Sequence, residues 1–252
     1  MANYDQERLH QTRLGASADM SIDQGLRSYM LSVYNYMAGA LALTGLVAYF
    51  AYAAAVQETA AGPVLTSFGE TLYASPLRWV VMLAPLAFIL VLSFGVHKLS
   101  LAATQMVFWT FASVMGLSLS SIFLVFTGES ITTTFFVTAA AFGSLSLYGY
   151  TTKRDLSGMG SFLFMGLIGI IIAMVVNLFL GSSALQFAIS VLGVLIFAGL
   201  TAYDTQRIKG MYYEGDSVAA AGKKAVMGAL SLYLDFINMF MFLLQFLGQQ
   251  RN

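Results

Sequence analysis

The sequence predicts an all-α membrane protein with seven transmembrane helices. Of its 252 residues, 58% are hydrophobic and 10% are charged, whereas a soluble domain carries about 25% charged residues. The apolar residues gather in seven stretches, each near the length of about 20 residues that a helix needs to cross a bilayer. Polar, glycine-rich or proline-containing segments separate these stretches, so each is expected to form a helix of its own.

The first three spans are bounded by residues that end helices. They cover Tyr29–Val56, Leu77–Val96 and Leu101–Phe126. The pairs Gly62-Pro63 and Ser75-Pro76 lie in the connection after the first span, and Gly and Pro interrupt helices. We therefore expect a long loop between the first two spans.

The last four spans are joined by shorter or more polar segments. They cover Ile131–Tyr150, Gly160–Leu180, Leu185–Ile208 and Ala225–Leu247. The connections that precede them are centred on residues 128–129, 152–155, 181–183 and 211–224. No internal repeat is evident, which disfavours an inverted-repeat transporter.

Two regions follow from this pattern, a polar tail over residues 1–28 and a seven-helix transmembrane domain over residues 29–252. Asp5 and Glu7 lie where a secretory signal carries positive charge, and no apolar core follows them. The tail is therefore not predicted to be a signal peptide. We expect it to be disordered or to lie on the membrane surface.

The basic residues predict the orientation. All of the 12 Lys and Arg residues except Arg78 and Arg251 fall on one set of tails and connections. Cytoplasmic connections of membrane proteins are enriched in Lys and Arg. The N-terminus is therefore expected to be cytoplasmic and the C-terminus, after an odd number of spans, to lie on the other side.

Composition excludes several classes of function. The formal net charge is +0, so no overall field attracts nucleic acid. Cysteine is absent, which removes disulfides and thiolate chemistry. The only two histidines, His10 and His97, are far apart in the sequence. Without a phosphate loop, a metalloprotease helix or a nucleophile elbow, the sequence does not predict an enzyme.

Two acidic residues remain after the other ten are assigned to tails, connections and helix ends: Asp204 and Asp235. Asp204 lies about 7–8 Å along its helix from Lys209, and Asp235 about 16 Å along its helix from Lys224. Both are thus placed in the cytoplasmic half of the membrane. A carboxylate inside a span costs about 2.5–3.5 kcal/mol on insertion scales, so it is a functional hypothesis by default.

The seventh span carries a polar stripe. Ser231, Asp235, Asn238 and Gln245 are spaced by four, three and seven residues, which places them on one face of a helix. The other faces carry Leu, Phe, Met and Ile. Such a stripe faces protein or water rather than lipid, so this helix is expected to be central and to line a polar path.

Two carboxylates close together in a medium of low dielectric cannot both ionise at little cost, and they titrate as a unit. A proton shared by Asp204 and Asp235 could close a path, and its loss would separate the two helices or create a site for a hard cation. Oxygen ligands of this kind suit Ca²⁺. The alternative is structural, with each carboxylate hydrogen-bonded to a neighbouring Ser, Asn or backbone group.

Three segments, Phe142–Ser157, Ala202–Lys209 and Ala229–Asn238, resemble the bacterial branch of the Bax inhibitor-1 family of seven-span membrane proteins. The resemblance implies six helices around a central seventh, in a bacterial inner membrane. It also implies a pH-sensitive calcium leak gated by Asp204 and Asp235. The family pattern further implies a basic latch on the second helix. Here only His97 and Lys98, at the inner end of that helix, are candidates.

Two other functions compete with a cation leak. Bacterial relatives have been linked to control of a membrane-embedded ATP-dependent protease of the FtsH type, which would make this chain a regulatory partner that uses its tail or the connection 211–224. Intramembrane aspartyl proteases also use two Asp residues on neighbouring helices. Their Gly-Xaa-Gly-Asp signature is missing around Asp204 and Asp235, so proteolysis is disfavoured.

Overall fold

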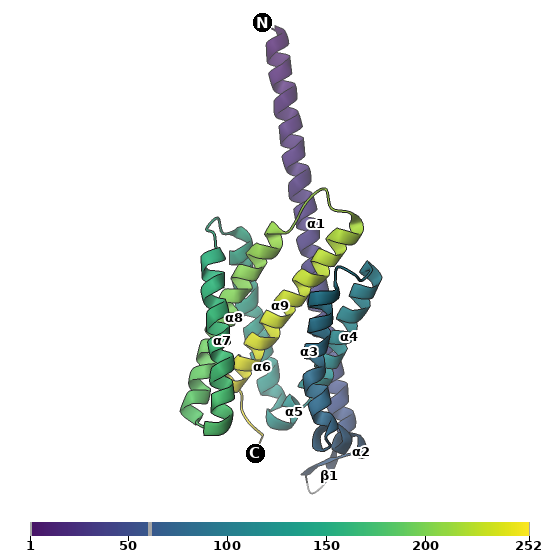
Figure 1. Cartoon of the computed structure of the whole chain (residues 1–252), viewed down its shortest axis with the longest axis vertical. Helices are drawn as coiled ribbons and strands as arrows, with labels where there is room; N and C mark the ends of the chain where they lie inside the picture. Colours follow the sequence, from purple (N-terminus) through teal and green to yellow (C-terminus); the bar gives the residue numbers. More distant parts are fainter. Residues whose placement is uncertain (1, 60–61, 252) are drawn as a thin grey trace.

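Long helices form the body of the protein in a computed structural model, which describes residues 2–59 and 62–251, with side chains from Gln24 onward except Glu58 (Figure 1). Within this described part, seven helices are long and apolar enough to cross a membrane. The prediction of an all-α, seven-span protein is therefore confirmed. The two chain ends lie at opposite ends of the bundle (Figure 1).

The helices agree with the predicted spans to within a few residues at most ends. They are α1 (Ala2–Ala55), α3 (Leu77–Gly95), α4 (Leu101–Leu119), α5 (Ile122–Val125), α6 (Gly128–Thr151), α7 (Ser157–Leu180), α8 (Ser183–Gly210) and α9 (Val218–Leu247). The largest differences are two helix starts: α1 begins at Ala2 rather than Tyr29, and α9 begins at Val218 rather than Ala225. The Ser217 hydroxyl accepts a hydrogen bond of 3.2 Å from the Ala220 N–H, and this cap lets the helix begin earlier.

The predicted tail and the first span share one helix. The backbone of α1 is helical from Ala2 onward, and its first part extends beyond the bundle (Figure 1). Only its portion Gln24–Ala55 has the composition of a membrane span.

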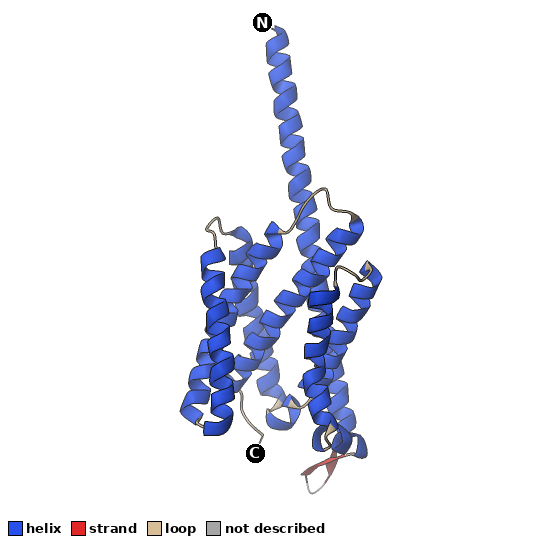
Figure 2. Ribbon diagram, viewed as in Figure 1, coloured by secondary structure: helices blue, strands red, loops and turns tan. Residues whose placement is uncertain are grey.

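The connection between α1 and α3 has structure that the sequence did not reveal. Strands β1 (Val56–Thr59) and β2 (Gly62–Leu65) form an antiparallel hairpin (Figure 2). A short helix α2 (Ser67–Gly69) and a π-helical turn η1 (Glu70–Ala74) follow. Burial raises the pKa of Tyr73 in this turn, and its hydroxyl donates a 2.8 Å hydrogen bond to Ser120 Oγ at the break between α4 and α5.

Helix α9 lies between two groups of three helices. One group contains α1, α3 and α4, and the other contains α6, α7 and α8 (Figure 1). The apolar window of α9 is 67% buried inside the protein, against 11–33% for the other six spans. Helix α7 is the most hydropathic span, with a mean of 2.7, and is 11% buried. Lipid-facing helices need apolar side chains all round, whereas α9 can carry polar groups because protein surrounds it.

A buried hydrogen-bond chain ties α9 to the first group. Tyr233 is fully buried, and its hydroxyl lies 2.7 Å from Thr44 Oγ1, which donates to the Ala112 carbonyl at 2.8 Å. The ring of Tyr233 meets that of Phe111 edge to face at 5.4 Å. Because buried polar groups are costly without partners, these contacts fix the rotation of α9 and hence the direction of its polar stripe.

The C-terminal residues lie along the start of α6. Gln250 forms a β-bridge with Phe126. The Thr127 N–H donates to the Gln249 carbonyl at 3.0 Å, and the Arg251 N–H donates to the Val125 carbonyl at 2.8 Å. The chain end is therefore attached to the end of the bundle that lies opposite the N-terminal extension of α1 (Figure 1).

Candidate functional site

Asp204 and Asp235 line the same cavity. It has a volume of about 570 Å³ and lies among α7, α8 and α9. Both residues are buried, with exposed fractions of 7% for Asp204 and 5% for Asp235. The structure thus brings together the two carboxylates that the sequence singled out, one from the inner part of α8 and one from the middle of α9.

Arg207 is the one cation that lines this cavity among the residues described. Its Nη2 lies 3.2 Å from Asp204 Oδ1 and donates a 3.2 Å hydrogen bond to Ser231 Oγ on α9. The guanidinium also lies 5.7 Å from the centre of the Tyr203 ring. Arg207 therefore links α8 to α9 at the level of the aspartates.

The carboxylates are short of partners. Within the described part of the chain, Asp204 Oδ1 and Asp235 Oδ2 are buried without a hydrogen bond. The Arg207 guanidinium is near Asp204 but not aligned for a hydrogen bond, so charge alone holds that pair. Asp235 lines the same cavity as Asp204 and Arg207. If both carboxylates were ionised, the single guanidinium would leave one negative charge in the cavity without a counter-charge.

Polar residues of α9 complete the lining. Ser231 and Asn238 border the same cavity as the aspartates, and Asn238 donates from Nδ2 to the Leu234 carbonyl at 2.8 Å. The fourth residue of the predicted stripe, Gln245, lies farther along the helix, where its Oε1 accepts 2.8 Å and 3.3 Å hydrogen bonds from Gln186 and Ser190. The polar stripe therefore has two parts: Ser231, Asp235 and Asn238 at the cavity, and Gln245 with Gln186 and Ser190 farther along the helix.

An apolar pair separates these two parts. The rings of Phe197 on α8 and Phe242 on α9 are stacked at 5.9 Å and 26°, and both border the aspartate cavity. Along α9, Phe242 stands between Asn238 and Gln245. A Cβ atom at Gly193 would lie 2.6 Å from the Phe242 ring, so only glycine leaves room for it there. The rings form an apolar barrier between the aspartates and the glutamine cluster.

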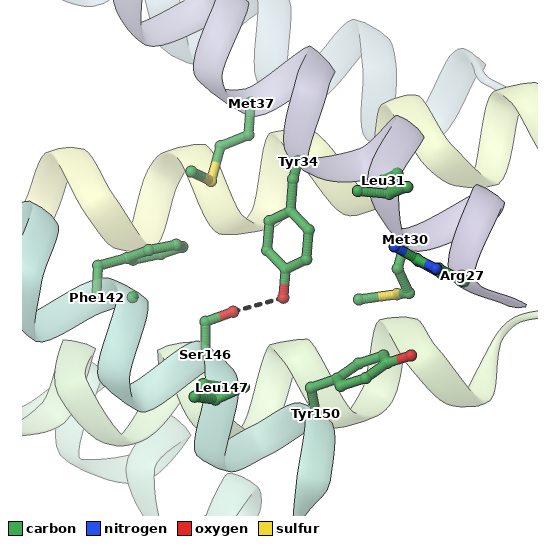
Figure 3. A pocket seen from close by; sticks show the side chains of 10 residues that line it. Arg27, Met30, Leu31, Tyr34, Met37, Phe142, Ser146, Leu147 and Tyr150 are labelled. Atoms are coloured by element: carbon green, nitrogen blue, oxygen red, sulfur yellow. Dashed lines mark hydrogen bonds between the residues drawn. The ribbon is translucent and has the colours of Figure 1, made fainter.

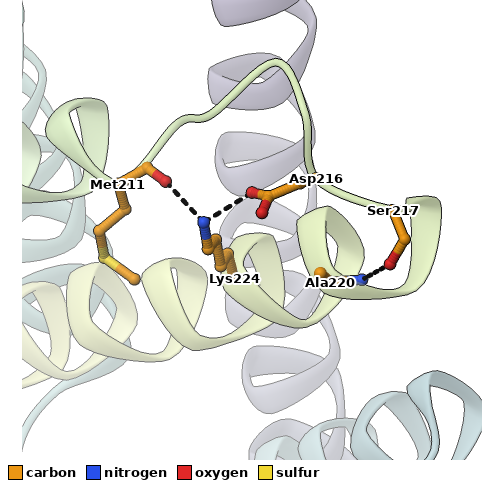
Figure 4. A network of polar contacts seen from close by, with 5 residues as sticks. All are labelled: Met211, Asp216, Ser217, Ala220 and Lys224. Atoms are coloured by element: carbon orange, nitrogen blue, oxygen red, sulfur yellow. Dashed lines mark hydrogen bonds and ion pairs between the residues drawn. The ribbon is translucent and has the colours of Figure 1, made fainter.

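The candidate latch residues lie elsewhere. His97 and Lys98 belong to the turn after α3, and His97 borders another cavity, of about 480 Å³, beside Lys223 and Lys224. Within the described residues neither side chain forms an ion pair with an aspartate. Lys224 instead holds the loop between α8 and α9, at 2.6 Å from Asp216 Oδ2 and 3.1 Å from the Met211 carbonyl (Figure 4).

A resident metal site of the usual kind is not formed in the described residues, where no three His, Cys, Asp or Glu side chains gather as ligands. The cavity does present oxygen atoms from Asp204, Asp235, Ser231 and Asn238. Ca²⁺ prefers about 6–8 oxygen ligands, some of them water. If each of these four residues contributed one oxygen, they alone would supply fewer ligands than a Ca²⁺ ion prefers.

The three segments noted in the sequence meet in space. Ser146 Oγ lies 2.9 Å from Thr205 Oγ1, and Lys209 Nζ donates to the Tyr150 carbonyl at 2.9 Å. Gln206 holds the turn before α7, because its Oε1 accepts from the Leu156 N–H at 2.9 Å. The end of α6 thus contacts the end of α8, which contacts the middle of α9 through Arg207 and Ser231.

Comparison with known proteins shows the family to which the chain belongs. The family described as "Inhibitor of apoptosis-promoting Bax1" matches residues 26–252. A protein of Caulobacter vibrioides is 50% identical over 242 residues, covering 93% of this chain and 94% of the relative. The inner membrane protein YbhL of Escherichia coli is 47% identical over 230 residues, covering 90% and 94%. A Rickettsia prowazekii protein is 46% identical over 236 residues, covering 94% and 95%. The chain therefore belongs to the Bax inhibitor-1 family.

Proposed function

We propose that this protein is a pH-sensitive leak pathway for calcium or a similar cation, gated by Asp204 and Asp235. The observation that carries the proposal is one cavity that is lined by two buried carboxylates and a single guanidinium. A proton or a cation can supply the counter-charge for the second carboxylate. The site is thus suited to exchange one for the other.

The gating follows from this exchange. With one proton on the pair, the remaining carboxylate is balanced by Arg207, and α8 and α9 stay together through the Arg207 contact with Ser231. When the proton leaves, two like charges face each other in a medium of low dielectric, where their repulsion is strong. The helices separate or a cation enters. The leak is therefore expected to increase with pH.

The stacked rings of Phe197 and Phe242 are the barrier that such opening has to relieve. They lie on the two helices that carry the aspartates, so separation of α8 from α9 also separates the rings. An apolar constriction of this kind gates by excluding water. The separation of α8 from α9 therefore couples the charge on the aspartates to the entry of water between the two rings.

The test uses the full chain in liposomes loaded with a calcium indicator, with efflux or influx measured over a range of pH. Wild-type protein should leak more at higher pH. Asp235→Asn keeps the size of the side chain and removes its charge, so its leak should not vary with pH. Glu129→Gln, an exposed acid in the first turn of α6, is the matched control. An Asp235→Asn profile identical to the wild type would contradict the mechanism.

The location is inferred from relatives and composition. YbhL is named an inner membrane protein, and the present chain has seven spans of matching character. We infer that it lies in the same kind of membrane, in contact with lipid on all sides of the bundle. The excess of basic residues on the inner connections places the N-terminus in the cytoplasm.

A second candidate function, regulation of a membrane-embedded ATP-dependent protease, is favoured by one observation. The backbone of α1 before Gln24 extends beyond the bundle (Figure 1), where a cytoplasmic partner could contact it. Deletion of residues 2–23 should then change proteolysis in cells while the liposome leak stays constant. Unchanged proteolysis would contradict a regulatory role for this segment.

A further inference from the structure

A third cavity, of about 660 Å³, forms a groove between α1 and α6 (Figure 3). Both helices pack on α9 but make little contact with each other. The groove is flanked by Leu31 of α1 and Leu147 of α6, which are 51% and 62% exposed. Because exposed leucines in a spanning helix face hydrocarbon, the groove opens toward the membrane.

The two ends of the groove differ in chemistry. Arg27 and Tyr150 lie at one end, and Met37 and Phe142 lie at the other (Figure 3). A second cation stands beside the first end, since Lys209 Nζ lies 5.0 Å from the centre of the Tyr150 ring. The groove is therefore amphipathic, with a basic end and an apolar end.

The middle of the groove offers no competing polar partner. The Tyr34 hydroxyl lies 2.7 Å from Ser146 Oγ (Figure 3), which in turn lies 2.9 Å from Thr205 Oγ1. These hydroxyls satisfy one another, so an apolar chain can pass them without leaving a polar atom unpaired.

The length of the groove matches one leaflet. Arg27 and Met37 are ten residues apart on α1, which corresponds to about 15 Å at 1.5 Å per residue. The hydrocarbon core of a bilayer is about 30 Å thick, so one leaflet contributes about 15 Å. The basic end is also the end that the distribution of Lys and Arg places at the cytoplasmic surface.

We propose that this groove binds one anionic phospholipid of the inner leaflet. One acyl chain lies between α1 and α6, and the phosphate group lies beside Arg27, at the end of the groove where Lys209 stands next to Tyr150. The basic end of the groove can bind a negatively charged headgroup, and the apolar remainder can bind an acyl chain. This combination favours a lipid over a protein helix. The inference is independent of the cation pathway, because it concerns a different cavity and is tested by binding.

Gly143 allows the groove to be filled without damage to the fold. It borders the groove, and a Cβ atom there would meet nothing within 4 Å. Gly143→Leu should therefore occupy the space of the acyl chain. Gly169→Leu on α7 is the matched control, because a Cβ atom there also meets nothing within 4 Å and the residue lies outside the groove.

Native mass spectrometry of the full chain, exchanged from detergent into phosphatidylglycerol or phosphatidylcholine, measures the bound lipid. Wild type and Gly169→Leu should each retain one phosphatidylglycerol, and Gly143→Leu should lose it. Arg27→Gln should reduce the preference for phosphatidylglycerol over phosphatidylcholine about fivefold, the effect of one basic residue near anionic lipid. Arg154→Gln, which removes another arginine on the inner side, should leave this headgroup preference unchanged.

Three results would overturn the proposal. Equal lipid retention by Gly143→Leu would place the lipid elsewhere. Equal preference for the two headgroups in the wild type would remove the role of Arg27. A dimer that dissociates in Gly143→Leu would show that a second copy of the chain covers the groove.

Discussion

Replacing Arg207 by glutamine removes the positive charge that faces both aspartates. Breaking a fully buried ion pair costs about 3–5 kcal/mol, whereas an exposed pair contributes about 0.2–1 kcal/mol. The side chain of Asp204 is 10% exposed and that of Arg207 is 41% exposed, so solvent screens one partner. We therefore expect Arg207→Gln to lower the free energy of unfolding by about 1–2 kcal/mol, between these limits.

The assay is thermal unfolding of the full chain in detergent at several pH values. For a chain of this size, about 1–2 kcal/mol corresponds to a decrease in Tm of about 2–8 °C. The decrease should grow as pH rises, because repulsion between the carboxylates requires both to be ionised. Arg154→Gln removes an exposed inner arginine and serves as the control.

A double variant separates the charge effect from lost packing. Adding Asp204→Asn to Arg207→Gln removes the uncompensated carboxylate, so most of the lost stability should return. Equal Tm values for Arg207→Gln and the wild type at alkaline pH would refute the reasoning. So would a double variant whose losses simply add, because the two residues would then act independently.

Two further changes test the packing of α6 and the start of α7. Gly149→Ala should lower stability by about 1–3 kcal/mol, because its Cβ would lie 2.2 Å from the Ala202 carbonyl oxygen. Gly143→Ala is the control, because a Cβ atom there meets nothing within 4 Å, and its Tm should equal or slightly exceed that of the wild type. If both variants lowered the Tm equally, the close contact of Gly149 with Ala202 would not explain the loss. Hydrogen bonds from Ser157 lower the pKa of Asp155, so its contribution is present above the ordinary value of about 3.9 and is lost as pH falls through the lowered value. The Tm difference between Asp155→Asn and the wild type should thus be largest at neutral pH and vanish in acid. A difference that stays constant with pH would show that the ionised Asp155 carboxylate does not stabilise the fold.

Much of the fold could be predicted from the sequence because membrane spans are specified by length and hydropathy. The polar stripe of Ser231, Asp235 and Asn238 also pointed to a central last helix, since lipid does not tolerate such a face. The hairpin after α1 was missed, because its strands Val56–Thr59 and Gly62–Leu65 are too short for a periodic pattern. The Gly and Pro residues there indicated only a loop.

The site was predicted in part. Asp204 and Asp235 are recognisable as carboxylates inside spans, but the role of Arg207 is not, because an arginine near the end of a span is typical of the inner membrane surface. Its spacing of three residues from Asp204 places both on one helix face and was a readable signal. The contact with Ser231 and the groove between α1 and α6 depend on how helices pack, which the order of residues alone does not specify.

The attachment of the chain end bears on how the protein is handled in the laboratory. Gln250 pairs with Phe126, and the Arg251 side chain donates to the Phe123 carbonyl at 3.1 Å. A purification tag or fluorescent reporter fused after Asn252 would emerge directly beside these bonds and compete with them. Fusion before Ala2, at the far end of the part of α1 that extends beyond the bundle (Figure 1), keeps the bonds intact and is the better choice for flux and binding experiments.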